Sequence, residues 1–192
     1  ALVAASCSSQ SEAAEDSVDF TRVTSALEPV EVPGIDKVHT LGGIYFASQP
    51  DEAAFTAAKA GGLATVIDLR HADETEFDEK KLVEGLGLDY VHVPWNGADE
   101  LTDEVLDRVR EVLVTAERPL LMHCKSANRV GAVWLPYRVL EEGASLESAL
   151  TEAKTVGLKK DAYEEKARDY IERRDPDPVP ETNMNTFSTK FT

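Results

Sequence analysis

The spacing of apolar and polar positions along the chain predicts an alternation of strands and helices. Short apolar runs indicate strands at residues 44–48, 63–69, 88–93 and 120–123. The run at 63–69 is nearly continuous, which is typical of a parallel strand buried on both faces. Periods near 3.6 residues predict helices at 51–60, 77–86, 102–115, 130–142, 146–156 and 160–174. This alternation predicts a three-layer α/β domain with a mostly parallel central sheet flanked by helices.

The amino-acid composition predicts where the domain begins and ends and which segments flank it. We expect the remnant of a signal or lipobox segment at residues 1–7, a flexible acidic tether and lead-in at 8–34, the domain at 35–174 and a disordered tail at 175–192. The tether is rich in Ser, Ala and acidic residues. The tail starts with Asp-Pro-Asp-Pro-Val-Pro, which supports neither a helix nor a strand ladder.

The formal charge of −16 argues against a nucleic-acid partner, because phosphate backbones would be repelled at long range. Two cysteines exclude a four-cysteine zinc site, and the four histidines lack ligand spacing. We therefore expect no metal and no nucleic-acid partner, and we expect a monomer.

The first cysteine, Cys7, follows an apolar and small-residue stretch that opens the sequence. This stretch resembles a bacterial lipoprotein lipobox, which implies lipidation of Cys7, possible membrane attachment through that lipid, and an exported, periplasmic or membrane-anchored protein. A plain tail with an incidental thiol is one alternative, and a disulfide between Cys7 and Cys124 in an exported protein is the other.

The second cysteine, Cys124, ends an apolar strand, and Arg129 opens the next helix after a short polar loop. A helix N-terminus favours an anion, either a thiolate or a bound oxyanion, and the arginine fork can hold two of its oxygens. Arginine is itself electrostatically unfavourable there, which favours a bound anion as its partner. The alternative is a buried structural thiol. His123 either tunes the thiolate through the loop backbone or is a core imidazole.

Three predicted strands are followed by segments rich in ionisable, thiol or aromatic side chains, at residues 70–71, 95–100 and 123–129. Sites in such sheets form at the carboxyl ends of strands, so we expect these segments to meet in one pocket.

The sequence His-Cys-Lys-Ser-Ala-Asn-Arg-Val-Gly-Ala at residues 123–132 resembles the phosphate-binding loop of cysteine-dependent protein phosphatases. The closer match is to the bacterial branch of atypical dual-specificity phosphatases, including the phosphatase-like domain of beta-lactamase-hydrolase-like proteins. Segments 42–50, 65–70, 76–79 and 88–94 follow the order of that family's elements, so the resemblance covers roughly residues 35 to 157. It implies a cysteine-phosphatase-like fold.

The resemblance also implies a mechanism without a cofactor. Cys124 would attack phosphorus, while Arg129 and the loop hold the other phosphate oxygens of a phosphorylated small molecule or phosphoprotein. Asp99, in the loop after the third predicted strand, would be the general acid, with Glu100 the next candidate and Asp103 a helix-start residue. The substrate-binding residues of the loop would be His123, Lys125, Ser126, Ala127 and Asn128.

The loop departs from the common phosphatase pattern, because four residues instead of five separate Cys124 from Arg129. Ala127 stands where relatives often have glycine, which limits access to positive φ at that position. Four-residue spacing also resembles the active loop of rhodanese-type sulfurtransferases, in which the cysteine carries a persulfide. Sulfur transfer from Cys124 and a non-catalytic oxyanion-binding module are therefore alternative functions.

Overall fold

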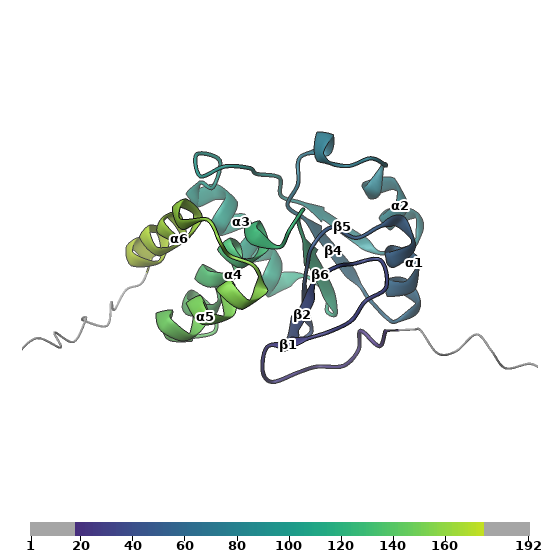
Figure 1. Ribbon diagram of the computed structural model, residues 1–192, viewed down its shortest axis with the longest axis horizontal. Coiled ribbons are helices and arrows are strands. Elements are labelled where there is room, and N and C mark those ends of the chain that lie inside the picture. Colours follow the sequence, from purple (N-terminus) through teal and green to yellow (C-terminus); the bar gives the residue numbers. More distant parts are fainter. Residues whose placement is uncertain (1–17, 175–192) are drawn as a thin grey trace, which may run out of the picture.

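The computed structural model describes residues 18–174, which form a six-stranded sheet with helices on both faces (Figure 1). The three-layer α/β architecture expected from the sequence is confirmed. The expectations for Cys7, for residues 8–17 of the tether and for the tail at 175–192 lie outside the described residues. No helix within 18–174 has both the length and the apolar character needed to cross a membrane.

The sheet has the strand order β1-β2-β3-β6-β4-β5. Its strands are β1 (Glu28–Pro29), β2 (Val38–Leu41), β3 (Ile44–Ala47), β4 (Thr65–Asp68), β5 (Asp89–His92) and β6 (Leu120–His123). Strands β3, β6, β4 and β5 run parallel, and β1 and β2 extend the β3 edge antiparallel. The parallel strands match the sequence prediction, whereas the two short antiparallel strands were not predicted.

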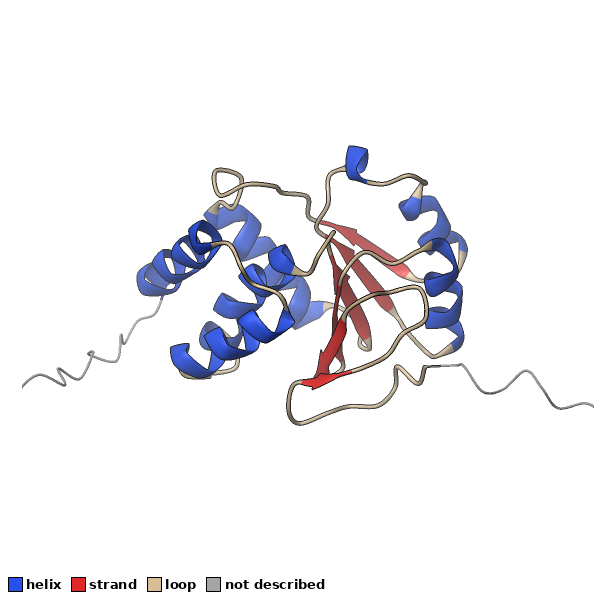
Figure 2. Cartoon of the chain, viewed as in Figure 1, coloured by secondary structure: helices blue, strands red, loops and turns tan. Residues whose placement is uncertain are grey.

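The helices form two layers (Figure 2). One face carries α1 (Glu52–Ala60) and α2 (Glu79–Gly85), and the other carries α3 (Asp103–Thr115), α4 (Asn128–Leu140), α5 (Leu146–Val156) and α6 (Asp161–Arg174). A single 3-10 turn, η1 (Ala72–Glu74), follows β4. Helix α2 begins later than predicted because the Asp78 side chain accepts a hydrogen bond from Lys81 N and caps it.

Strand β6 shows how the two faces receive alternate side chains. Leu120 and Met122 lie in the apolar cluster under α3–α6, whereas Leu121 lies in the cluster under α1 and α2. All four β6 positions are buried, because helices cover both faces of the sheet. The same alternation continues at the end of β6, where it separates His123 from Cys124.

The lead-in packs on the domain from its first described residues. Phe20 is fully buried, its ring lies 4.5 Å from that of Tyr45, and its N–H donates to Gly61 O at 2.9 Å. A Cβ on Gly61 would lie 2.0 Å from Val18 O, so only glycine allows this approach. Phe20 and Gly61 therefore tie this part of the lead-in to the α1 side of the domain.

Candidate active site

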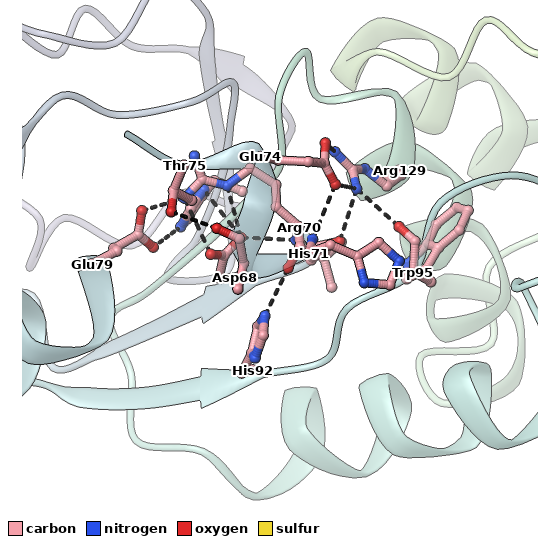
Figure 3. Close-up of polar contacts among 12 residues, drawn as sticks. Asp68, Arg70, His71, Glu74, Thr75, Glu79, His92, Trp95 and Arg129 are labelled. Carbon is pink, nitrogen blue, oxygen red and sulfur yellow. Dashed lines mark hydrogen bonds and ion pairs between the residues drawn. The ribbon is translucent and has the colours of Figure 1, made fainter. Parts of the chain in front are cut away.

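The three segments that follow β4, β5 and β6 meet at the carboxyl edge of the sheet, as predicted. Arg129, in the first turn of α4, joins them: its Nη1 donates to Leu69 O after β4 at 3.1 Å and to Trp95 O after β5 at 2.9 Å (Figure 3). The arginine is 5% exposed. Its guanidinium is thus held by backbone carbonyls from two neighbouring strand ends, while its own loop comes from the third.

The loop at residues 124–129, here called the anion cradle, turns sharply into α4. Ala127, the residue before the helix, adopts φ 61° and ψ 3°, so the chain takes up the left-handed conformation here even though a Cβ disfavours it. Neighbouring segments hold the turn, because Ser126 forms a β-bridge with Ser48 and Ala127 is fully buried. A Cβ on Gly157 would lie 2.8 Å from Ala127 O, so the end of α5 approaches the cradle only because residue 157 is glycine.

Cys124 lies at the base of the cradle and is 1% exposed. Its thiol is free among the residues that the structure describes, and it contacts the apolar cluster under α3–α6. Arg129 is its charged neighbour. Burial alone would lower the pKa of Arg129, but hydrogen bonds to Glu74 and the charge of Cys124 outweigh it and raise that pKa. A thiolate at Cys124 would therefore face a permanently charged guanidinium.

Glu74, in η1, binds the outer end of the Arg129 guanidinium. Its Oε1 lies 2.7 Å from Nη1 and its Oε2 lies 2.6 Å from Nη2, which makes the pair bidentate. The Arg129 hydrogen bond is the largest cause of a lowered Glu74 pKa. Glu74 also accepts from His71 N at 3.0 Å, which fixes the carboxylate at the turn. Arg129 Nε makes no hydrogen bond within residues 18–174, so the Nε edge is available to two oxygens of an anion.

The two candidate acids differ in their contacts. Glu100 accepts from Asn96 N at 2.7 Å, and its Oε2 lies 2.7 Å from His71 Nε2. The His71 hydrogen bond, followed by that from Asn96, lowers the pKa of Glu100 and holds it as a carboxylate. The Asp99 side chain is exposed and makes no hydrogen bond or ion pair to any residue in 18–174. This contrast favours Asp99 as the group that is free to exchange a proton with a ligand.

Asp103, expected to be a helix-start residue, is the first residue of α3. Its carboxylate lies 2.6 Å from Arg173 Nη2 in an exposed ion pair with α6. Its partner therefore comes from another helix and not from the anion cradle.

His123 does not line the anion cradle, which corrects its place among the substrate-binding residues. Its imidazole is fully buried on the α1 and α2 face, opposite the cluster that contains Cys124. Nε2 lies 2.9 Å from Glu79 Oε1, Nδ1 lies 3.9 Å from Asp68 Oδ1, and the ring packs edge-on against Phe55. The side chain is therefore part of a buried polar group and cannot contact a phosphate in the cradle.

That buried polar group is centred on Arg70, which is fully buried at the end of β4. Its Nε donates to Asp68 Oδ1 at 2.9 Å and its Nη2 also bonds Glu79 (Figure 3). The Tyr90 hydroxyl donates to Asp68 at 3.1 Å. Burial would raise the pKa of Asp68, but the charge of His123 and the bonds from Arg70 lower it. We call Asp68, Arg70, Glu79, Tyr90 and His123 the buried charge cluster.

Three members of the buried charge cluster have donor atoms close enough to hold a metal ion. Ligand atoms of Asp68, Glu79 and His123 lie within 4.8 Å of one another. Arg70, however, already supplies a cation that bonds both carboxylates. The donor set is therefore neutralised internally, and the arrangement fits a structural ion cluster better than a metal centre. The sequence missed this grouping because its members come from three separate elements.

The remaining loop residues differ in how exposed they are and in what they contact. Lys125 and Ser126 are exposed at the rim of the cradle. Asn128 is half-buried, and its Oδ1 accepts from Lys159 N at 2.8 Å, so its amide ties the cradle to the α5–α6 connection. Trp95 is fully buried with its ring 4.9 Å from that of Tyr163, which is core packing and not a surface for a substrate ring.

Comparison with known proteins identifies the family and the fold. The sequence profile of the family described as "Beta-lactamase hydrolase-like protein, phosphatase-like domain" matches residues 38–139, more than half of the chain. No curated protein sequence matches the chain.

Solved structures share the fold at low sequence identity. The DUF442 protein of Shewanella putrefaciens CN-32 is 20% identical with a TM-score of 0.62, and the match covers 74% of this chain and 96% of that one. TpbA of P. aeruginosa is 23% identical with a TM-score of 0.61, covering 78% and 90%. Tk-PTP in its active form is 21% identical with a TM-score of 0.57, covering 69% and 93%. The cysteine-phosphatase-like fold is thereby confirmed, and the chain belongs to the beta-lactamase-hydrolase-like phosphatase-like domain family.

Proposed function

We propose that this protein hydrolyses phosphate monoesters through a cysteinyl-phosphate intermediate on Cys124. The observation that carries the proposal is the set of hydrogen bonds that Arg129 makes. Glu74 and two backbone carbonyls hold its outer end, Cys124 is a neighbour of the guanidinium, and Nε makes no hydrogen bond to residues 18–174. A tetrahedral oxyanion placed over the thiol would complete the coordination of the guanidinium and the N–H donors of the loop.

In the first step, the Cys124 thiolate attacks phosphorus and the bond from phosphorus to the leaving oxygen breaks. Asp99 gives its proton to that oxygen, so the alcohol leaves neutral. In the second step, water attacks the cysteinyl-phosphate and gives a proton to the Asp99 carboxylate. The S–P bond breaks, inorganic phosphate leaves, and the thiolate is restored. Arg129 compensates the charge on the equatorial oxygens in both steps.

The substrate class that we propose is a phosphorylated small molecule or a phosphoprotein. One support is that TpbA of P. aeruginosa, with which this chain shares the fold, has been crystallised in complex with pTyr. The free Asp99 carboxyl is a second support, because an alcohol leaving group needs a proton donor.

We also propose that the protein is exported and is lipidated at Cys7. This proposal rests on the sequence before residue 18 alone. Expression of the full precursor in a bacterial host tests it: the wild-type protein should enter the membrane fraction, and a Cys7→Ser variant should become extractable in buffer. Identical fractionation of the two proteins would contradict lipidation.

Sulfur transfer is the second candidate, and the four-residue cradle is the observation that favours it. A smaller ring of donors suits a persulfide or a thiosulfate sulfur as well as a phosphate. In that reaction Cys124 would take the outer sulfur of thiosulfate, releasing sulfite, and pass it to a nucleophile such as cyanide.

Hydrolysis of 4-nitrophenyl phosphate by the purified protein tests the phosphatase proposal. We expect turnover that the Cys124→Ser variant loses by roughly 10⁴-fold or more, with a melting temperature close to that of the wild type. A Cys124 thiol whose alkylation rate follows a pKa near about 8.5 would contradict both catalytic proposals. Turnover of thiosulfate and cyanide without phosphate release would instead support sulfur transfer. If neither reaction occurs but phosphate raises the melting temperature, the protein binds oxyanions without catalysis.

A further inference from the structure

Two lysines from segments far apart in sequence have backbones tied to residues that contact the anion cradle. Lys37 precedes β2, its carbonyl accepts from Ser48 N at 2.9 Å, and its N–H donates to Ser48 Oγ at 3.2 Å. Ser48 in turn forms the β-bridge to Ser126 of the cradle. Lys159 lies in the α5–α6 connection and donates its N–H to Asn128. Each lysine is thus one contacting residue away from the Ser126–Asn128 side of the cradle.

Neither lysine has an acidic partner. Within residues 18–174 no carboxylate oxygen lies within 4.0 Å of the amino group of Lys37 or Lys159, although the chain has 36 acidic residues and a charge of −16. Burial first, and then the charge of Lys159, lower the pKa of Lys37, which places the two like charges near each other. His39, also half-buried, is disfavoured as a cation by burial and by Lys37, so no nearby group offsets the repulsion.

Like charges held together without a counter-ion lower stability unless a ligand compensates them. The folded chain nevertheless fixes both lysine backbones. Lys159 belongs to a connection whose approach to the cradle requires Gly157, and this connection lies outside the residues 38–139 that match the family profile. Lys37 and Lys159 therefore both lie outside the residues that match the family profile, on segments tied to the Ser126 and Asn128 ends of the cradle.

We propose that Lys37 and Lys159 form a second anion subsite, so that the natural substrate carries a second anionic group, a phosphate or a carboxylate, near the phosphate held by the cradle. The proposal rests on the proposed function, because it requires the cradle to bind phosphate. It adds a substrate class: molecules with two anionic groups are preferred to those with one. The second group would lie over Ser126 and Asn128, and the leaving oxygen would face the loop that carries Asp99.

Binding of inorganic phosphate and inorganic triphosphate to the full-length Cys124→Ser protein tests this proposal by calorimetry at constant ionic strength. We expect one triphosphate per protein, bound at least about tenfold more tightly than phosphate. The double variant Lys37→Gln/Lys159→Gln should lose most of that preference and keep its affinity for phosphate. Lys81→Gln is the matched control, because it removes one exposed lysine from α2 on the other face of the sheet. It should keep the full preference.

The outcomes separate the subsite from the catalytic proposal. If phosphate binds but the preference for triphosphate is the same in the lysine double variant and in the control, the subsite is refuted and the phosphatase proposal stands. If the double variant weakens phosphate and triphosphate equally, the lysines serve the cradle alone and the subsite is again refuted. In the active protein, the double variant should hydrolyse 4-nitrophenyl phosphate within about twofold of the wild-type rate, because this probe has a single anionic group. If neither phosphate nor triphosphate binds, both proposals fail.

Discussion

His123 and Cys124 are consecutive residues, yet they belong to two regions with opposite designs. On the α1 and α2 face of the sheet, His123 joins the buried charge cluster, in which Arg70 pairs with both Asp68 and Glu79 and all four of these side chains are buried. On the other face, Cys124 lies below Arg129, whose outer end is saturated by Glu74 and whose Nε edge is unpaired. In the closed region the charges of buried side chains compensate one another, and in the open region one edge of Arg129 has no hydrogen-bond partner among residues 18–174.

The difference teaches that an arginine's role depends on which of its edges remains unpaired. Arg70 and Arg129 are both nearly inaccessible and both bind carboxylates. Arg70 has carboxylates on its Nε and Nη2 atoms, and its Nη1 is buried without a hydrogen-bond partner, so no atom of Arg70 is open to a ligand and the residue serves the fold. Arg129 has its carboxylate at the Nη1 and Nη2 end, so its Nε edge can receive a ligand. Breaking the closed region should therefore affect stability, and breaking the open one should affect turnover.

The largest expected effect is on the closed region. Glu79→Ala leaves Arg70 and His123 buried without one of their carboxylates, and removing one partner of a buried ion pair typically costs about 3–5 kcal/mol. We expect urea denaturation to show a loss of that size in the free energy of unfolding. Glu84→Ala is the control on the same helix, since its pair with Lys80 is exposed at 3.9 Å, and it should change stability by less than about 1 kcal/mol. Equal losses in the two variants would contradict a stabilising role for the cluster.

The second effect is on turnover. Asp99→Asn should lower kcat for 4-nitrophenyl phosphate by about 10²–10³-fold, because it removes the proposed proton donor, and it should leave the melting temperature unchanged. Glu100→Gln should cost far less activity, since Glu100 is already held as a carboxylate by His71 and Asn96. The pH profile of kcat checks the assignment: the limb due to the acid should disappear in Asp99→Asn only. A larger loss in Glu100→Gln would transfer the role to Glu100.

The sequence predicted the open region far better than the closed one. The residues of the cradle are contiguous in sequence, so a single segment contains Cys124, Arg129 and the start of the helix that follows. Glu74 was missed because its partner lies 55 residues away and nothing in its own neighbourhood marks it. The position of His123 could have been inferred, since neighbouring residues of a strand point to opposite faces. Strand β2 was missed because its four residues lie near the start of the domain and its pairing depends on a hairpin with β3.

A smaller effect is expected from the residue that fixes the open region. Glu74→Gln should raise KM for 4-nitrophenyl phosphate by about tenfold, because Arg129 loses its charged partner and the cradle is less well ordered. The Glu74 pKa is lowered in the folded protein. Its contribution to stability is therefore fully present above the usual value of about 4.5 and is lost as the pH falls through the lower folded value. Melting temperatures of wild type and variant should accordingly converge in acid. A constant difference between them at all pH values would show that the charge of Glu74 is irrelevant.

The smallest effect concerns the backbone of the cradle. Ala127 holds φ 61°, which costs a residue with a Cβ about 1–2 kcal/mol relative to glycine. Ala127→Gly relieves that strain. It also raises the conformational entropy of the unfolded chain, which lowers the free energy of unfolding by about 0.4–1 kcal/mol, and it removes a fully buried methyl group. We therefore expect a change in unfolding free energy within about 1 kcal/mol and little change in kcat. Ala127→Val, which adds branching at the same φ, should instead destabilise the protein clearly. If Ala127→Gly also destabilised it by more than about 1 kcal/mol, packing of the methyl against the end of α5, and not the turn, would set the shape of the cradle.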